Sequence, residues 1–271
     1  MIPVARPLLK WAGGKAQLLD ALAGYLPDRP YRYVEPMIGG GALFFALAPD
    51  RALIADINPE LINFYRAIVA DLDGVIAAYE AWPFAEDTFY ELRALSFENL
   101  DATTAAARLL YLNRACFNGL YRVNRTGGFN VPWGRYAKGY VVERERFVAA
   151  RAALSRAQIE LGDFRDVLTA EARAGDFVFL DPPYVPVAKY ADFKRYTRAQ
   201  FHDPDHVAMA ALAVTLAERG CDVVITNSNH PLVHDLYRGY DPRVLPTRRN
   251  VNAQGSGRRG EDVIIHVPAA S

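Results

Sequence analysis

Residues 177–184, FVFLDPPY, place a carboxylate, two prolines and an aromatic ring directly after an apolar run. An amine on a heteroaromatic ring is a poor nucleophile, because its lone pair is delocalised into the ring. Asp181 can accept one N–H of such an amine and the Pro182 carbonyl the other, which would draw the nitrogen toward tetrahedral geometry. Tyr184 offers a stacking face, and Pro182 and Pro183 fix φ. The motif predicts chemistry on a flat, amino-bearing base; a Pro-rich turn is the simpler alternative.

Three glycines and an acid at the ends of two other strand-like runs would hold a ligand beside that motif. Gly39, Gly40 and Gly41 in EPMIGGGALFF lack the Cβ that would keep a ligand from the backbone. Their spacing is not GxGxxG, which disfavours a pyrophosphate, and a plain strand-to-helix turn is the alternative. Asp56 can accept hydrogen bonds from a ribose hydroxyl, or else cap the helix after Pro59. A nucleoside bound here could present a methyl group in line with the base.

Two more segments join this expected cofactor site. LKWAGGK pairs Trp11 with Lys15, and a stacked aromatic and a cation suit an adenosyl group that bears a carboxylate. A buried Trp beside a turn would explain the same residues. Asp163 and Phe164 follow the strand-like QIEL, so we expect them at the same edge of the sheet.

The elements that must position these residues alternate between strand and helix at both ends of the chain. Residues 31–58 have the pattern of a β-α-β unit, and strands return from about residue 155 with FVFLD and VVITN, which are nearly all apolar. Residues 59–115 show helical spacing, and 116–142 are rich in glycine, asparagine and aromatic residues. We therefore expect an α/β fold, with a catalytic domain formed by 1–58 and 151–271 and an inserted domain at 59–150.

The charge of the chain is balanced overall but uneven along its length. There are 31 basic and 31 acidic side chains among 271 residues, so net charge predicts no polyanionic ligand. Two segments without Asp or Glu are basic, however: 102–142 carries Arg108, Arg114, Arg122, Arg125, Arg135 and Lys138, and 242–260 carries Arg243, Arg248, Arg249, Arg258 and Arg259. These patches predict that a polyanion is held at one face.

Metal chemistry and membrane insertion are not indicated. The two cysteines, Cys116 and Cys221, form neither a disulfide framework nor a CxxC motif. The pairs His202/His206 and His230/His234 do not match HExxH, and helix capping or surface exposure explains them. No run of about 18 apolar residues occurs. We expect a cytoplasmic, metal-free monomer.

Seven motifs taken in order resemble the Dam-type, alpha class, adenine-N6 DNA methyltransferases: LKWAGGK, VEPMIGGGALFF, ADIN, YLNRACFNGLYR, GGFNVPWGRY, DPPY and TRRNVNAQGSGRR. The resemblance extends from Lys10 to about Val267. It implies a Rossmann-like methyltransferase sheet with an inserted helical and hairpin target-recognition domain, S-adenosylmethionine as donor, and an adenine flipped out of double-stranded DNA as acceptor. In the family, the positions of Trp11, Lys15, Asp56 and Asp181 bind the cofactor.

The same resemblance implies DNA contacts for the basic insertion. The position of Arg122 reads a guanine in the family, and that of Phe117 wedges into the duplex. The further positions expected to contact DNA are Lys10, Asn118, Leu120, Asn124, Pro132 and Tyr136. Similar motifs accompany GATC recognition, but Phe117 stands where Tyr is common and Val123 where an aromatic is common. GATC is therefore an expectation.

Other functions stay open at this stage. Cytosine-C5 methylation needs a nucleophilic Cys, typically after Pro, whereas Cys116 follows Ala115 and Cys221 follows Gly220. Cytosine-N4 methylation also acts on a conjugated amine, and a different adenine sequence could be read. A DNA-binding homologue without activity is the non-enzyme alternative, which Asp181 disfavours. The sequence is compatible with a solitary methylase, a restriction-modification enzyme or a phage enzyme.

Overall fold

A seven-stranded sheet forms the centre of the molecule. The computed structural model describes residues 5–13, 15–124, 127–187, 201–248 and 259–270. Along the sheet the strands are β3 (Ala157–Leu161), β2 (Ala52–Asp56), β1 (Tyr33–Glu35), β4 (Phe177–Leu180), β5 (Asp222–Ser228), β7 (Arg259–Val267) and β6 (Arg243–Arg248). The first five are parallel, whereas β7 is antiparallel to both β5 and β6. The α/β prediction is confirmed, and the sheet is mixed.

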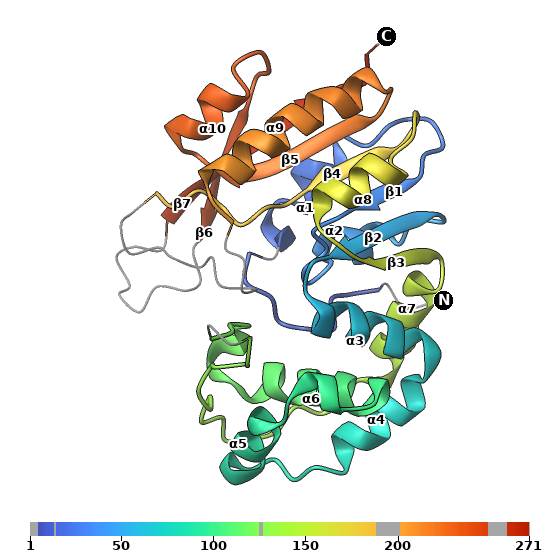
Figure 1. Cartoon of the computed structure of the whole chain (residues 1–271), viewed down its shortest axis with the longest axis vertical. Coiled ribbons are helices and arrows are strands. Elements are labelled where there is room, and N and C mark those ends of the chain that lie inside the picture. The colour runs from blue at the N-terminus through green and yellow to red at the C-terminus, as the bar shows by residue number, and fades with distance from the viewer. Residues whose placement is uncertain (1–4, 14, 125–126, 188–200, 249–258, 271) are drawn as a thin grey trace.

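Alternation of side chains along the strands gives the sheet two buried faces. In β4, Phe177 and Phe179 join one hydrophobic cluster, while Val178 and Leu180 join another. This is the period of two that a strand imposes, and it explains why a strand covered on both sides is apolar throughout. Figure 1 shows α8 and α9 across one face of the sheet.

The helices divide between these two faces. Residues of α8 (Phe164–Glu171), α9 (Asp203–Glu218) and α10 (Pro231–Leu236) belong to the second cluster. The first cluster contains residues of the remaining α-helices, which are α1 (Leu19–Ala23), α2 (Ala42–Leu47), α3 (Pro59–Ala70), α4 (Leu72–Glu80), α5 (Glu86–Ala94), α6 (Ala102–Ala115) and α7 (Arg144–Leu154). The helical segment 59–154 therefore shares one core with the sheet. In Figure 1, α4, α5 and α6 lie at the end of the molecule away from α9 and α10.

A buried ion pair ties α3 to α6. Arg108 is 2% exposed, and its guanidinium lies 3.1 Å from the Glu60 carboxylate. It also donates to the carbonyl oxygens of Leu92 and Leu95, near the end of α5. Burial raises the pKa of Glu60, and Arg108 opposes that shift. Within the described part of the chain, no helix is long and apolar enough to cross a membrane.

Candidate active site and nucleic-acid interface

The carboxyl ends of the parallel strands bring the predicted catalytic and cofactor residues to one edge of the sheet. Glu35 ends β1, Asp56 ends β2, and Asp181 follows β4 directly. Strand register aligns Leu180 of β4 with Ile225 of β5, so the residue after each lies at the same level. In parallel α/β sheets this edge is where ligands bind.

Both carboxylate oxygens of Asp181 are held by other side chains. Lys15 Nζ lies 2.7 Å from Oδ2, and Thr226 Oγ1 donates to Oδ1 at 2.8 Å. Lys15 is 5% exposed and also donates to the Gly13 carbonyl. Burial raises the pKa of Asp181, while Lys15 and the Thr226 hydrogen bond act to lower it. The structure thus brings Lys15 onto the DPPY motif, although the sequence assigned it to the cofactor.

The rest of the DPPY motif is fixed from two sides. Lys15 Nζ lies over the Tyr184 ring, 4.6 Å from its centroid, and the Tyr184 hydroxyl lies 3.5 Å from Asp262 Oδ2. Asn227 Oδ1 accepts from the Val185 amide at 3.0 Å, and Ser228 Oγ donates to the Val185 carbonyl at 2.6 Å. Pro182 is buried and Pro183 half-buried. The loop after β4 therefore has a fixed path.

Sequence reasoning missed the three residues that hold this loop from β5. Thr226, Asn227 and Ser228 are each at most 2% exposed. The available signal was a run of three polar residues at the end of the apolar strand CDVVITNSN, because buried polar groups need hydrogen-bond partners.

Asp56 is joined to the glycine loop. Its Oδ2 accepts from the Gly39 amide at 3.0 Å and its Oδ1 from the Asn58 amide at 2.9 Å. Burial raises the pKa of Asp56 to about 6, although these two hydrogen bonds act to lower it. Asn58, and not Asp56, caps α3, since its side chain accepts from Glu60 and Leu61. The capping alternative for Asp56 is therefore wrong.

Trp11 lies against the glycine loop. A Cβ placed on Gly39 or Gly40 would come within 2.9 or 2.8 Å of the Trp11 side chain, so only glycine fits there. Gly39 also has φ of 46° and Gly41 of 66°, which favours glycine independently. The Trp11 ring also stacks on Tyr121, with centroids 5.1 Å apart and planes at 21°.

A second buried acid, Glu35, lies at this sheet edge and was not predicted. It is 2% exposed and accepts a hydrogen bond from the Tyr33 hydroxyl at 2.9 Å. Burial raises its pKa well above the usual range, and the nearby Asp181 adds to that rise. Its position directly before the glycine loop, in EPMIGGG, was the signal.

Asp163 and Phe164 occupy the start of α8. Asp163 caps this helix by accepting from the Arg165 amide at 2.9 Å, and its carboxylate pairs with the Arg165 guanidinium at 2.9 Å. Phe164 is 3% exposed and belongs to the second hydrophobic cluster. Gly162 donates to the Asp56 carbonyl at 3.1 Å, which brings this segment next to the end of β2.

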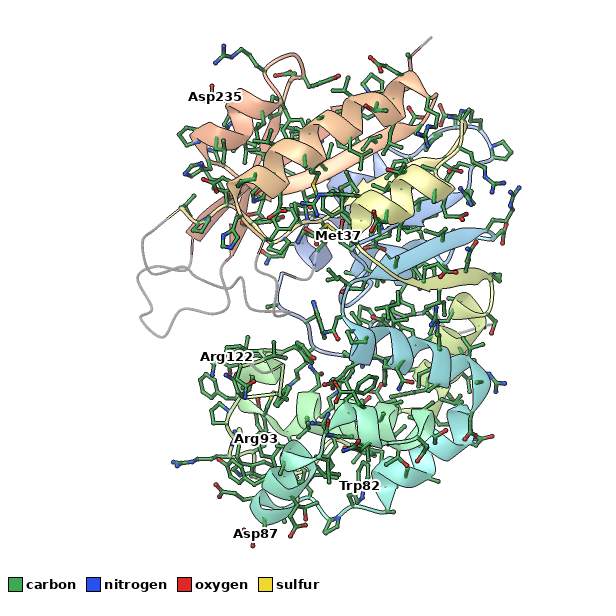
Figure 2. All side chains as sticks on the ribbon, in the orientation of Figure 1. Met37, Trp82, Asp87, Arg93, Arg122 and Asp235 are labelled. Atoms are coloured by element: carbon green, nitrogen blue, oxygen red, sulfur yellow. The ribbon has the colours of Figure 1, made fainter. Side chains whose placement is uncertain are left out.

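The predicted DNA-reading residues lie on a short hairpin-like segment after α6. Two isolated bridges, Cys116 with Trp133 and Val123 with Phe129, pair its two sides. Arg122 is exposed, and its Nε donates to Asn130 Oδ1 at 2.7 Å. Figure 2 shows Arg122 on the side of the helical region that faces the sheet.

The other predicted contact residues surround Arg122 on this segment. Phe117 is 50% exposed, Asn118, Asn124 and Pro132 are exposed, and Leu120 and Tyr136 are half-buried. Asn124 Oδ1 accepts from the Gly128 amide at 2.9 Å and so closes the turn. Val123, where an aromatic was expected, is buried.

Lys10 is attached to the same segment. The buried Asn113 side chain accepts from the Lys10 amide at 2.8 Å and donates to the Lys10 carbonyl at 2.7 Å. Asn113 also donates to the Gly119 carbonyl at 3.2 Å. The Lys10 ammonium lies 5.1 Å from the centroid of the Tyr136 ring.

The basic segment 102–142 is not uniformly available to a polyanion. Arg108 is buried against Glu60, so the expectation of cations without opposing acids is wrong for it. Arg114 packs on the Tyr140 ring at 3.9 Å. Arg135 and Lys138 are exposed. Arg125, Arg249 and Arg258, with most of TRRNVNAQGSGRR, lie outside the described residues.

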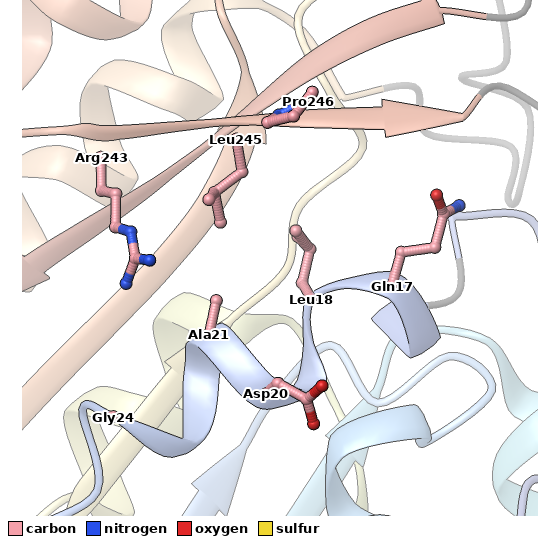
Figure 3. A pocket seen from close by; sticks show the side chains of 8 residues that line it. All are labelled: Gln17, Leu18, Asp20, Ala21, Gly24, Arg243, Leu245 and Pro246. Atoms are coloured by element: carbon pink, nitrogen blue, oxygen red, sulfur yellow. The ribbon is translucent and has the colours of Figure 1, made fainter.

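The histidine pairs show mixed behaviour: His230 caps α10 as expected, whereas His206 is 3% exposed, lies 3.4 Å from the Asn227 side chain and so is not a surface residue. Among the described residues, no group of three His, Cys, Asp or Glu side chains is arranged to hold a metal ion. A hollow of about 440 Å³ between α1 and β6 (Figure 3) is lined by Gln17, Leu18, Asp20, Ala21, Gly24, Arg243, Leu245 and Pro246, none of which was predicted to act in catalysis.

The fold and this edge define an α/β enzyme in which a held carboxylate, a rigid proline pair and an aromatic ring adjoin a glycine loop. The sequence pattern of the D12 class N6 adenine-specific DNA methyltransferases matches residues 11–251. The chain belongs to this family, which uses S-adenosylmethionine. The resemblance inferred from the motifs is confirmed, and the enzyme is an adenine-specific DNA methyltransferase.

Relatives match over nearly the whole chain. A type II methyltransferase of Lactococcus lactis subsp. cremoris, M1.LlaDCHI, is 36% identical over 261 residues, which cover 93% of this chain and 92% of the relative. A DNA adenine methylase of Vibrio cholerae is 35% identical over 96% of this chain and 95% of its own. The DNA adenine methylase of Escherichia coli K12 is 33% identical over 96% and 94%.

Proposed function

We propose that this methyltransferase modifies the adenine of GATC in duplex DNA, after that base has been flipped into a site formed by Asp181, Pro182, Pro183 and Tyr184. The observation that supports the site most directly is the Asp181 carboxylate, held between Lys15 and Thr226 beside the Tyr184 ring. An acceptor fixed in this way is ready for an N–H that arrives in one orientation.

In this proposal Asp181 and the Pro182 carbonyl accept the two N6 hydrogens. A carboxylate has about four acceptor positions, so Asp181 can bind N6–H while it keeps its hydrogen bond from Thr226. Tyr184 stacks on the adenine, and Lys15, which lies over the Tyr184 ring, favours the ionised form of Asp181. When bound, S-adenosylmethionine would supply an electrophilic methyl group to N6 and leave as the neutral thioether, and the Asp181 carboxylate would take up the N6 proton that the new bond displaces.

The cofactor side of the edge fits such a donor. Asp56 accepts two backbone N–H groups, and its remaining acceptor positions suit ribose hydroxyls. The Trp11 side chain lies against Gly39 and Gly40, next to the backbone that the donor would approach. We assign the donor to Trp11, Lys15, Gly39, Gly40, Gly41, Asp56, Asp163, Phe164 and Asp181. The seven-stranded order, with β7 inserted between β5 and β6, supports a Rossmann-like methyltransferase sheet for this role.

The inserted region, residues 59–150, is proposed as the target-recognition domain, and 1–58 with 151–271 as the catalytic domain. Exposed Arg122 would fork onto guanine O6 and N7, and Phe117, half exposed, would enter the duplex. Further DNA contacts are proposed for Lys10, Asn118, Leu120, Asn124, Pro132 and Tyr136. GATC rests on the motif resemblance together with these exposed positions.

The test is methyl transfer from S-adenosylmethionine to methylation-free genomic DNA, with every modified position mapped. N6-methyladenine confined to GATC is the expected result. Another adenine sequence would refute GATC and direct attention to Phe117 and Val123. Asp181→Ala should lose transfer but keep sequence-specific DNA binding, and near-full transfer by that variant would refute the role of Asp181.

A further inference from the structure

A stacked pair of aromatic rings connects the DNA-reading segment to the cofactor side of the enzyme. Tyr121 immediately precedes Arg122, and its ring stacks on Trp11 at 5.1 Å with planes at 21°. Tyr121 is 6% exposed and also packs edge-on against Phe129, whose ring centroid lies 5.7 Å away. A residue of the recognition segment therefore supports one face of Trp11.

The Trp11 side chain is also in contact with the glycine loop. No Cβ fits on Gly39 or Gly40 without meeting Trp11. Gly39 in turn donates to Asp56 Oδ2 at 3.0 Å, and its carbonyl accepts from Tyr65 at 2.6 Å. Contacts thus run from Tyr121 through Trp11 and Gly39 to the acid proposed to bind ribose.

The backbone beside Trp11 is fixed to the same segment. Asn113 holds both the amide and the carbonyl of Lys10, and it also binds the Gly119 carbonyl. A Cβ on Gly119 would lie 2.4 Å from Lys10 Cδ, so the two chains pass in close contact. Movement of the recognition segment would consequently move residues 10 and 11 with it.

We infer that Tyr121 is a positioning residue for the donor site, so that S-adenosylmethionine affinity depends on the conformation of the DNA-reading segment. This inference rests on the proposed role of Trp11 in holding the donor. Because coupling between two binding sites is reciprocal, donor binding and sequence-specific DNA binding strengthen each other through this stack. A segment seated on its guanine holds Tyr121, and with it Trp11, in place.

The experiment measures the Kd of S-adenosylmethionine by calorimetry on the full chain. The Kd is measured for the enzyme without DNA, for the enzyme with a duplex that contains the target sequence mapped for the wild type, and for the enzyme with a duplex that lacks this sequence. Tyr121→Leu should raise the Kd about 3- to 10-fold, the effect of losing one aromatic pair. Tyr121→Phe keeps the ring and should stay within about twofold of the wild type. Tyr90→Leu, which removes an aromatic pair with Phe89 at α5, is the matched control and should leave the donor Kd nearly unchanged.

Coupling gives a second measurement, the difference in donor Kd between the two duplexes. Wild-type enzyme should bind the donor more tightly with the specific duplex than with the other one, and Tyr121→Leu should shrink that difference. Equal donor affinity with both duplexes, or a Tyr121→Leu variant that matches the wild type throughout, would overturn the inference. Trp11→Leu separates the two proposals: if it leaves the donor Kd unchanged, the proposed role of Trp11 fails. If it weakens binding while Tyr121→Leu does not, only the role of Tyr121 fails.

Discussion

Thr226 offers the sharpest test of how the catalytic carboxylate is held. Its hydroxyl is fully buried and donates to Asp181 Oδ1 at 2.8 Å. Thr226→Val keeps the shape of the side chain and removes this donor. Hydrogen bonds to charged groups contribute about 1.5–3 kcal/mol, which corresponds to a loss of roughly 10- to 150-fold in the rate of methyl transfer. Thr226→Ser keeps the hydroxyl and is the control.

The sign of the pH effect follows from the same hydrogen bond. Burial raises the pKa of Asp181, whereas the Thr226 hydroxyl stabilises the ionised form and lowers it. Without that hydroxyl the pKa of Asp181 rises further, so a higher pH is needed to ionise it. The acidic limb of the kcat/KM profile should therefore move to higher pH in Thr226→Val and stay in place in Thr226→Ser.

The assay is single-turnover transfer of labelled methyl groups to duplex DNA across a pH series, with DNA binding measured in parallel. Thr226→Val should transfer slowly and bind DNA normally, because the change lies behind Asp181 and away from the DNA-reading segment. A Val variant within twofold of the wild type, with an unshifted acidic limb, would refute the idea that this hydroxyl orients and ionises Asp181.

Three further predictions concern reading, donor binding and stability. Arg122→Lys keeps the charge but loses the planar guanidinium that can donate two hydrogen bonds to one base. Discrimination at one guanine should therefore fall by about 1–3 kcal/mol in competition binding. Lys138 is also exposed, and Lys138→Ala is the control that should leave sequence preference unchanged. The pKa of Asp56 is raised to about 6, and its ionised form is proposed to accept ribose hydroxyls. The donor Kd should therefore rise as pH falls through about 6, and Asp56→Asn should remove that step in calorimetry. Arg108→Met leaves Glu60 buried without its cation and should destabilise the fold by about 3–5 kcal/mol in denaturant unfolding, part of which Glu60→Gln should restore.

Sequence reasoning succeeded where a single local pattern determines the outcome. The apolar run before Asp181 predicts a strand buried on both faces, and β4 is such a strand. The three-glycine loop was predicted to let a ligand approach the backbone, which stays a prediction; the group that lies against Gly39 and Gly40 in the structure is the Trp11 side chain. These features depend on the residues within one segment.

What could not be predicted depends on contacts between distant segments. Arg108 has no acid near it in the sequence, yet Glu60, 48 residues away, neutralises it in the core. The cofactor role of Lys15 stays a prediction, and its ion pair with Asp181, far away in the chain, could not be read from the residues around Lys15. The antiparallel position of β7 between β5 and β6 also depends on the topology of the sheet, because the apolar pattern of VIIHV determines neither the order nor the direction of the strand.

Three carboxyl groups with pKa values raised by burial, Glu35, Asp56 and Asp181, meet at this sheet edge. A raised pKa means that ionisation of each group costs folding free energy as the pH increases, so these acids make the free enzyme less stable at neutral pH than neutral residues of the same shape would. Such a cost is retained where function needs it. In the roles proposed for Asp56 and Asp181, the donor's ribose hydroxyls and the adenine amine would add further O–H and N–H donors to these buried carboxylates. Binding of donor and base would then offset part of this cost and favour the ionised form of Asp181.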